Sequence, residues 1–341
     1  MVAFGYTVMG EQAGPKQLVA DAQRAEAAGL DFIAASDHYF PWLAEQAGFD
    51  YIAASDHYFP WLAEQGHSPY TWSVLGAVAH ATERIDLMTY VTCPIMRYHP
   101  VVVAQKAATI QLLSDGRFTL GLGAGENLNE HVIGQGWPPV DIRHEMLSEA
   151  VQIIRRLFDG ETVTFRGNHL DCESARLWDL PPDAPPIGIA VSGPDSCELA
   201  GEYADVMIAV EPRKDLGEMF DAAGGRGKPR IGQVGLSYDP DPDAARKRAL
   251  EQFRWFTGGW KTMAELPGPK HFDAAAKMVR EEDVAKQIPC GPDVDAHVQA
   301  VKKFVDAGFT HVAVVQIGGE YQDMFFPWAE KELLPALREL G

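Results

Sequence analysis

The sequence predicts a TIM-type (β/α)8 barrel with insertions, in which residues 1–341 form a single domain. Strand-like runs alternate with helix-like segments almost throughout, which is typical of a parallel sheet covered by helices. The runs lack polar alternation, as expected for strands that are buried on both faces. A doubly wound sheet is the alternative fold, but GEQAGP after the first run lacks the glycine fingerprint that binds phosphate there.

One strand-like segment occurs twice in tandem. Residues 28–46 read AGLDFIAASDHYFPWLAEQ, and residues 47–65 read AGFDYIAASDHYFPWLAEQ. Two units are too few for a solenoid, which needs at least three, and two copies cannot occupy one barrel position. The second copy is continuous with the loop that leads to the next helix. We therefore expect the second copy to form the barrel strand and the first to be displaced into a connection.

The other elements follow in order along the chain. Residues 2–8 are the first strand, and Pro15 begins an amphipathic helix that ends at Gly29. Ser68-Pro69 is expected to cap the next helix. Further strands are expected at 85–92, 117–122, 187–192, 205–211, 229–239 and 310–318, with helices at 101–114, 146–158, 194–204, 241–256 and 293–308. Residues 161–172 read as an added hairpin, and the Gly-, Pro- and charge-rich stretch 257–292 as a lid over a site.

The amino-acid composition argues against some classes of binding partner. Asp and Glu number 48 against 29 Lys and Arg, and the net charge of −19 argues against nucleic acid or an anionic membrane. No run approaches the roughly 20 apolar residues of a membrane span, and the N-terminus lacks the pattern of a signal peptide. Scattered cysteines indicate reduced thiols in a cytoplasmic protein. A small-molecule substrate is the partner we expect.

Polar and glycine-rich residues gather at the expected strand ends, where a barrel carries its chemistry. They are Ser-Asp-His, Tyr90-Val91-Thr92, 123–127, 192–194 and 211–214. Each also has a plain structural explanation: a strand-end Asp often caps a turn, Glu126 could complement a helix N-terminus, and 192–194 could simply start a helix. We expect one rim of the barrel to carry an acid, a base, a glycine-rich backbone and an anion site. Together these features favour an active site.

Three of these motifs carry a family resemblance. The Ser-Asp-His…Pro-Trp, GLGAGENLNE and AVSGP segments together resemble the luciferase-like superfamily, in particular its branch of coenzyme F420-dependent oxidoreductases related to F420-dependent glucose-6-phosphate dehydrogenase. The resemblance implies hydride transfer between the C5 atom of the deazaflavin and an alcohol, carbonyl or enone substrate, in a homodimer. An FMN-dependent monooxygenase of the same superfamily and a non-catalytic deazaflavin-binding protein remain alternatives.

The resemblance also implies roles for individual residues. His57 is the base near the reacting carbon, Trp61 lies in the active site, and Glu126 is the acid on the ring-nitrogen side. The first-copy alternatives for the base and the tryptophan are His38 and Trp42. Cofactor contacts are implied for Asp56 or Asp37, for Gly125 and Asn129, for Tyr90-Val91 as a non-prolyl cis peptide, and for Val191, Ser192 and Gly193 at the phosphate tail. No metal site is expected.

The substrate wall departs from the sugar-phosphate enzymes. By the resemblance, those enzymes hold the substrate phosphate with two lysines and one arginine. Lys261 matches one lysine and Arg213 or Lys214 the other, but the arginine position falls on Gln287. An amide cannot reproduce the charge-assisted, bidentate contact of an arginine with phosphate. We therefore expect an alcohol or a carbonyl or enone compound rather than glucose 6-phosphate.

Overall fold

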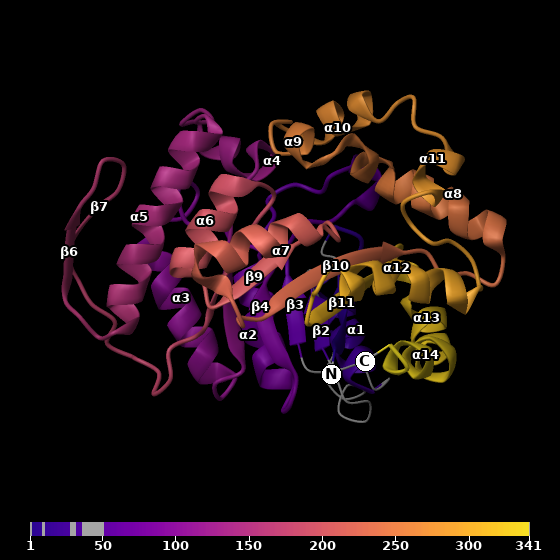
Figure 1. The fold of residues 1–341 in the computed structure, drawn as a ribbon, viewed down its shortest axis with the longest axis horizontal. Helices are drawn as coiled ribbons and strands as arrows, with labels where there is room; N and C mark the ends of the chain where they lie inside the picture. Colours follow the sequence, from indigo (N-terminus) through magenta and orange to yellow (C-terminus); the bar gives the residue numbers. More distant parts are fainter. Residues whose placement is uncertain (1, 9–10, 28–31, 36–50, 341) are drawn as a thin grey trace.

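The computed structural model of the protein describes residues 2–8, 11–27, 32–35 and 51–340 (Figure 1). The strands are β1 (Ala3–Val8), β2 (Phe32–Ala35), β3 (Tyr51–Ala54), β4 (Asp86–Thr89), β5 (Phe118–Leu122), β6 (Val163–Arg166), β7 (Asp171–Ala175), β8 (Ile187–Ala190), β9 (Val206–Ala209), β10 (Arg230–Leu236) and β11 (His311–Gln316). The helices are α1 (Pro15–Ala27), α2 (Thr71–Ala81), α3 (Pro100–Leu113), α4 (Asn127–Glu130), α5 (Val140–Phe158), α6 (Pro194–Tyr203), α7 (Lys214–Phe220), α8 (Pro242–Phe253), α9 (Trp260–Met263), α10 (Pro269–Ala275), α11 (Glu281–Ala285), α12 (Val294–Asp306), α13 (Gln322–Trp328) and α14 (Leu334–Arg338).

Parallel strands close into a barrel. Neighbouring strands pair in the order β1, β3, β4, β5, β8, β9, β10 and β11, and β11 pairs back onto β1 through residues such as Tyr6 and Val314. A separate apolar cluster joins Met88 and Tyr90 to Ile208, Ile231 and Ala313, which come from opposite sides of this ring. These side chains fill the barrel, so the interior is a packed core and not a pore. The predicted (β/α)8 barrel is confirmed.

The second copy of the repeated segment occupies the barrel position. Its strand β3 pairs with β1 on one side and with β4 on the other. The first copy also forms a strand, β2, which pairs with β1 at Gly5 and Val8. The sequence predicts that copy in a connection, and the structure differs because the two runs have nearly the same sequence and hence the same strand preference. Asp37, His38 and Trp42 lie outside the described residues.

The end of β5 shows why its sequence is rich in glycine. A Cβ atom on Gly121 would lie 1.9 Å from the carbonyl oxygen of Thr89 on β4, and one on Gly125 would lie 2.5 Å from Cys93 Sγ. Gly125 also has a φ angle of +81°, a conformation that side chains other than glycine rarely adopt. The GLGAG run therefore lets β5 and the following loop lie close against the neighbouring strand. This contact positions Glu126 at the barrel mouth.

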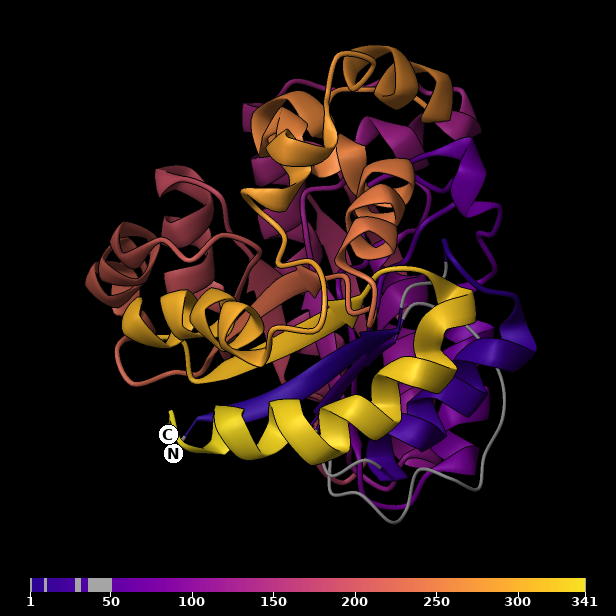
Figure 2. The same cartoon turned by 90° about the vertical axis from the view of Figure 1, so that its right-hand side faces the viewer.

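Two insertions decorate the barrel. Strands β6 and β7 form the expected antiparallel hairpin, although it extends to Ala175. The stretch 257–292 contains the helices α9, α10 and α11, which lie over one end of the barrel in both Figure 1 and Figure 2. The chain termini lie toward the opposite end. The sequence predicts a lid over a site in this stretch but not its helices, because short helices rich in Gly and Pro leave little periodic signal.

The start of α2 corrects one prediction. The helix begins at Thr71 after Tyr70, and its first turn receives no cap from Ser68. The Ser68 hydroxyl instead donates to the carbonyl oxygen of His57 at 3.2 Å. Ser68 therefore tethers the loop that follows β3 rather than the helix.

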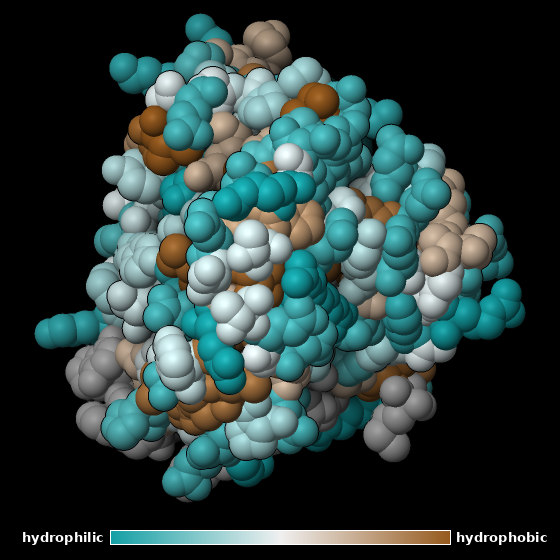
Figure 3. All heavy atoms as spheres, turned by 90° about the vertical axis from the view of Figure 1, so that its left-hand side faces the viewer, coloured by the Kyte–Doolittle hydropathy of each residue, from teal (hydrophilic) through white to brown (hydrophobic). Residues whose placement is uncertain are grey.

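The surface agrees with the acidic composition. The face on the side of the β6–β7 hairpin is mainly hydrophilic, with small and separate apolar patches (Figure 3). Among the described residues, we find no helix with the length and apolar character needed to cross a bilayer.

Candidate active site

His57 lies between two carboxylates at the end of β3. Its Nδ1 is 2.9 Å from Glu11 Oε1, and its Nε2 is 3.5 Å from Glu126 Oε2. Burial alone lowers the pKa of His57, but the charges of Glu126 and Glu11 raise it by more, so the net direction is upward. A ring that keeps its proton on Nδ1, toward Glu11, presents Nε2 toward Glu126 as a proton acceptor. The arrangement therefore suits a general base whose tautomer is fixed by a buried carboxylate.

Glu126 is held as a carboxyl that can change protonation near neutral pH. It occupies the position before α4, but its carboxylate caps no N–H of this described helix. Oε2 accepts from Asn129 Nδ2 at 3.2 Å, while Asn129 Oδ1 accepts from the N–H of Tyr58 at 2.8 Å. Burial raises the pKa of Glu126 to about 7, although the nearby His57 lowers it. A largely buried group with this pKa is a candidate acid or base.

Asp56 is a structural anchor in this mouth. It is only 3% exposed, and its Oδ2 accepts from Trp72 Nε1 and from Thr92 Oγ1, both at 2.9 Å. Its Oδ1 accepts from Tyr98 Oη and from Arg97 Nη2, both at 3.2 Å. Both oxygens of the Asp56 carboxylate therefore accept hydrogen bonds from side chains of the protein. Contact between Asp56 and a cofactor stays a prediction.

Trp61 belongs to the same loop as His57 but faces an apolar cluster. Its ring stacks on Trp255 at 4.2 Å, with an angle of 6° between the planes, and meets Phe272 edge-on at 5.0 Å. It also contacts His57, with 4.9 Å between ring centroids. Trp61 is 5% exposed. Its position links the histidine to the segment 257–292, which covers the barrel mouth.

The barrel mouth has a partly exposed apolar floor. Val91, Ala190 and Val210 lie at or just after the ends of β4, β8 and β9, and pack onto the cluster that fills the barrel. The Tyr90–Val91 peptide bond is cis, as the family resemblance implies. An apolar floor with protonatable groups near it suits a flat, ring-shaped cofactor. The residues present therefore fit a deazaflavin or flavin ring.

The expected phosphate-tail segment lies at the start of α6. The N–H groups of Ser192 and Gly193 donate to Ser196 Oγ at 3.0 and 3.2 Å. Val191 is buried, whereas a Cβ atom on Gly193 would meet no described atom within 4 Å. Space is therefore present beside Gly193, but its N–H is paired within the protein. Phosphate binding by this segment stays a prediction.

A cavity of about 410 Å³ lies between the ends of β9 and β10, the segment 257–292 and α12. Its lining includes Glu211, Gln233, Trp260, Gln287, Ile288 and Lys303. Gln287 thus lines a cavity, while its contact with a substrate stays a prediction. The wall combines apolar and aromatic groups with few charges, which is typical of a small-molecule site.

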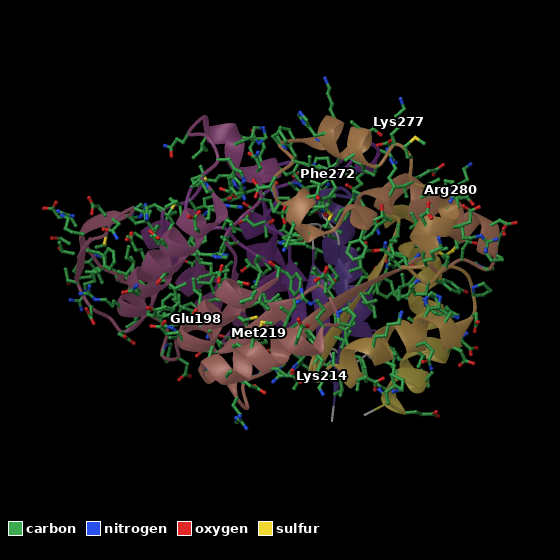
Figure 4. All side chains as sticks on the ribbon, turned by 45° about the horizontal axis from the view of Figure 1, so that its top comes forward. Glu198, Lys214, Met219, Phe272, Lys277 and Arg280 are labelled. Atoms are coloured by element: carbon green, nitrogen blue, oxygen red, sulfur yellow. The ribbon has the colours of Figure 1, made fainter. Side chains whose placement is uncertain are left out.

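The other residues proposed for a phosphate clamp do not gather around Gln287. Arg213 Nη2 is 2.5 Å from Asp215 Oδ2, and Lys214 is an exposed residue of α7 paired with Glu218. Lys214 lies well apart from Phe272 and the helices over the mouth (Figure 4). Lys261 is exposed on α9. The structure therefore supplies no convergent set of cations from these candidates.

Sequence reasoning missed Glu11 and Arg97. Glu11 follows β1 inside GEQAGP and is 1% exposed, yet it contacts His57. Arg97 lies in the loop between β4 and α3, with a 9% exposed side chain between Asp56 and Glu130. The one signal for Glu11 was its place after a strand, because functional residues collect at strand ends. Arg97 carried no such signal, since its partners are distant in sequence.

The sequence matches a known family and curated relatives over most of its length. Residues 42–311 match the model of the luciferase-like monooxygenase family. Two curated relatives are named F420-dependent glucose-6-phosphate dehydrogenase: that of Tsukamurella paurometabola is 35% identical, and that of Rhodococcus erythropolis is 34% identical. Each match covers 99% of this chain and 98% of the relative.

Solved structures show the same fold. An F420-dependent secondary alcohol dehydrogenase in complex with an F420-acetone adduct superposes with a TM-score of 0.83 at 26% identity, over 99% of both chains. A coenzyme F420-dependent tetrahydromethanopterin reductase from Methanopyrus kandleri gives a TM-score of 0.75 at 20% identity, over 98% of this chain and 99% of that one. The second likeness concerns the fold alone.

Proposed function

From the premise that the chain belongs to the luciferase-like monooxygenase family and is a coenzyme F420-dependent oxidoreductase, we propose that it interconverts a secondary alcohol and the corresponding ketone. The observation that carries the proposal is the buried pair of His57 and Glu126 at the barrel mouth. Such a pair can accept the hydroxyl proton of an alcohol and return it. The cavity lined by Gln287 has few charged residues, which favours an uncharged substrate.

The competing substrate is a sugar phosphate, since relatives that are 34–35% identical are named for glucose 6-phosphate. A phosphate dianion needs several cations to replace its hydration. Arg213 is paired with Asp215 and Glu211, and Gln287 is neutral. Lys303 is the cation on the described cavity lining, and Glu211 lies on the same lining. This balance of charge favours the uncharged substrate.

The cofactor, when bound, supplies the acceptor and donor of the hydride. Val91, Ala190 and Val210 would form the floor for its ring. His57 Nε2 takes the hydroxyl proton of the alcohol, while Glu11 holds the opposite nitrogen and stabilises the charged imidazole. Trp61 packs against the imidazole and limits its orientation. Each general acid or base of this kind typically contributes ~10²–10⁴-fold to the rate.

Glu126 completes the proton pathway. Because its pKa is raised to about 7, the carboxyl can lose a proton and take one up again at neutral pH. Its Oε2 is 3.5 Å from His57 Nε2, so a proton taken by the histidine can return to the carboxylate. Asn129 holds Glu126 in this position through its side-chain amide. The two groups titrate as a coupled pair.

The test compares two substrates on one enzyme. Protein loaded with F420 is supplied with 2-propanol or with glucose 6-phosphate, and reduction is followed by the absorbance of the oxidised cofactor. We expect a higher kcat/KM for the alcohol. We also expect Gln287→Arg to raise kcat/KM for glucose 6-phosphate by ~10-fold or more, because a charge-assisted hydrogen bond contributes ~1.5–3 kcal/mol. A wild-type preference for glucose 6-phosphate would overturn the proposal.

A further inference from the structure

We propose that Arg97 is the positioning residue of the acid–base pair. Its side chain fastens the loop that carries His57 to the helix that follows Glu126. Arg97 belongs to neither of these segments, because it lies between β4 and α3. It therefore acts as a third element that sets the distance between the two.

The first contact is to the loop after β3. Arg97 Nη2 donates to the carbonyl oxygen of Asp56 at 2.5 Å and to Asp56 Oδ1 at 3.2 Å. That carbonyl belongs to the peptide bond that leads directly into His57. The Asp56 carboxylate is itself held by Trp72 and Thr92. The guanidinium thus fixes the backbone immediately before the base.

The second contact is to α4. Arg97 Nε lies 3.4 Å from Glu130 Oε1, and the backbone N–H of Arg97 donates to Glu130 Oε2 at 2.9 Å. Glu130 ends the four-residue helix that begins just after Glu126. The side chains of Asp56 and Glu130 are 0% and 1% exposed, so these charges have little water to replace the arginine. Breaking such a buried pair leaves an uncompensated charge.

The charges around the pair give Arg97 a second effect. His57 faces Glu126, Glu11 and Arg97, while Glu126 faces His57, Glu11, Glu130 and Arg97. Arg97 itself faces Asp56 and Glu130, with Tyr98, Cys93 and Lys106 nearby. Arg97 is a cation close to both groups, and its charge opposes the upward shift of both pKa values. Removing its charge should therefore raise the pKa of His57 and of Glu126 together.

The experiment uses Arg97→Met, Arg97→Lys and the control Arg248→Met. Arg248 is matched to Arg97: it is buried, contacts the carboxylate of Asp239 and lies over the ring of Tyr321, but on α8. The imidazole of His57 is titrated by NMR in the protein without added cofactor, with its signal assigned from His57→Ala. The pH dependence of kcat is measured in the loaded enzyme. Only the kinetic measurement rests on the proposed function.

We expect Arg97→Met to shift the titration of His57 and the pH profile of kcat upward, and to lower kcat by ~10²-fold, a loss typical of a displaced reacting group. Arg97→Lys keeps the positive charge but cannot make the several hydrogen bonds of the guanidinium. We therefore expect the titration of His57 to stay close to wild type and kcat to fall. Arg248→Met should change neither. A folded Arg97→Met with an unchanged His57 titration overturns the proposal. If that variant does not fold, wild-type kcat in Arg97→Lys overturns it.

Discussion

The two sides of the barrel mouth are built in opposite ways. On one side, His57 lies between the buried carboxylates of Glu11 and Glu126, and burial combined with nearby charges raises the pKa of His57 and of Glu126. On the other side, Trp61 stacks on Trp255 and meets Phe272 edge-on, and none of these three side chains is charged. The first side is organised to move protons, and the second to define shape and keep water out. Changes on each side should therefore have different kinetic signatures.

The two sides share one short loop. His57 and Trp61 are both in the SDHYFPW motif after β3, and their rings touch at 4.9 Å. This link explains why the motif carries both a polar and an aromatic half. It also means that the duplicated segment brought a second copy of both halves into the chain. The following substitutions test the division, beginning with the largest expected effect.

Replacing His57 should remove the proton side altogether. We expect His57→Ala to lower kcat by ~10³-fold, within the range typical of a general base. His38→Ala is the matched control, because it alters the same motif in the first copy. We expect that control to retain wild-type kcat. The opposite result, with activity lost only in His38→Ala, would mean that the first copy supplies the working histidine.

Replacing Glu126 should change the rate and its pH dependence together. We expect Glu126→Gln to lower kcat by ~10²-fold and to remove a limb of the pH profile near pH 7, since an amide does not titrate. Burial raises the pKa of Glu126 from 4.5 to about 7, so ionising it costs folding stability as pH rises through that interval. The stability of Glu126→Gln relative to wild type should therefore increase from pH 4.5 to pH 7. Kinetics and denaturant titrations at several pH values check both statements.

Replacing Trp255 should disturb shape rather than proton transfer. We expect Trp255→Ala to raise KM by ~10-fold while kcat and the pH profile change little, and to lower the free energy of unfolding by ~3–5 kcal/mol. Trp178→Ala is the control, because Trp178 is 87% exposed. It should leave KM and stability unchanged. A shift in the pH profile of Trp255→Ala would show that the two sides are not separable.

The smallest effect is expected at Arg213. Its guanidinium is paired with Asp215 and Glu211 at the surface, so it is not available as a substrate cation. We expect Arg213→Gln to change kcat/KM for the alcohol by less than ~2-fold, since exposed ion pairs contribute ~0–1 kcal/mol. A loss of ~10-fold or more would place Arg213 at the substrate after all.

The sequence predicted the barrel and the motifs on its rim, because apolar runs and strand-end residues are local signals. It also predicted Gln287 at the substrate; the structure shows that Gln287 lines a cavity, and its role there stays a prediction. It could not predict that Glu11 meets His57, since that contact joins β1 to β3 across the folded ring. Ser68 was mistaken for a helix cap because a hydroxyl can bond several nearby backbone groups, and only the fold selects among them.

The contacts that hold α9 and the residues after it over the barrel mouth affect the expected rate-limiting step. The N–H of Asn127 donates to the carbonyl oxygen of Ala264 at 2.9 Å, and Glu265 contacts Arg143 at 2.7 Å and Trp137 at 2.8 Å. The edge-on contact of Trp61 with Phe272 on α10, at 5.0 Å between ring centroids, is a further attachment. A cover fastened in this way does not swing as a hinge, so we expect substrate to pass its edge without a slow opening step. We therefore expect the hydride step to limit the rate, and substrate deuterated at the reacting carbon to show a large primary isotope effect on kcat.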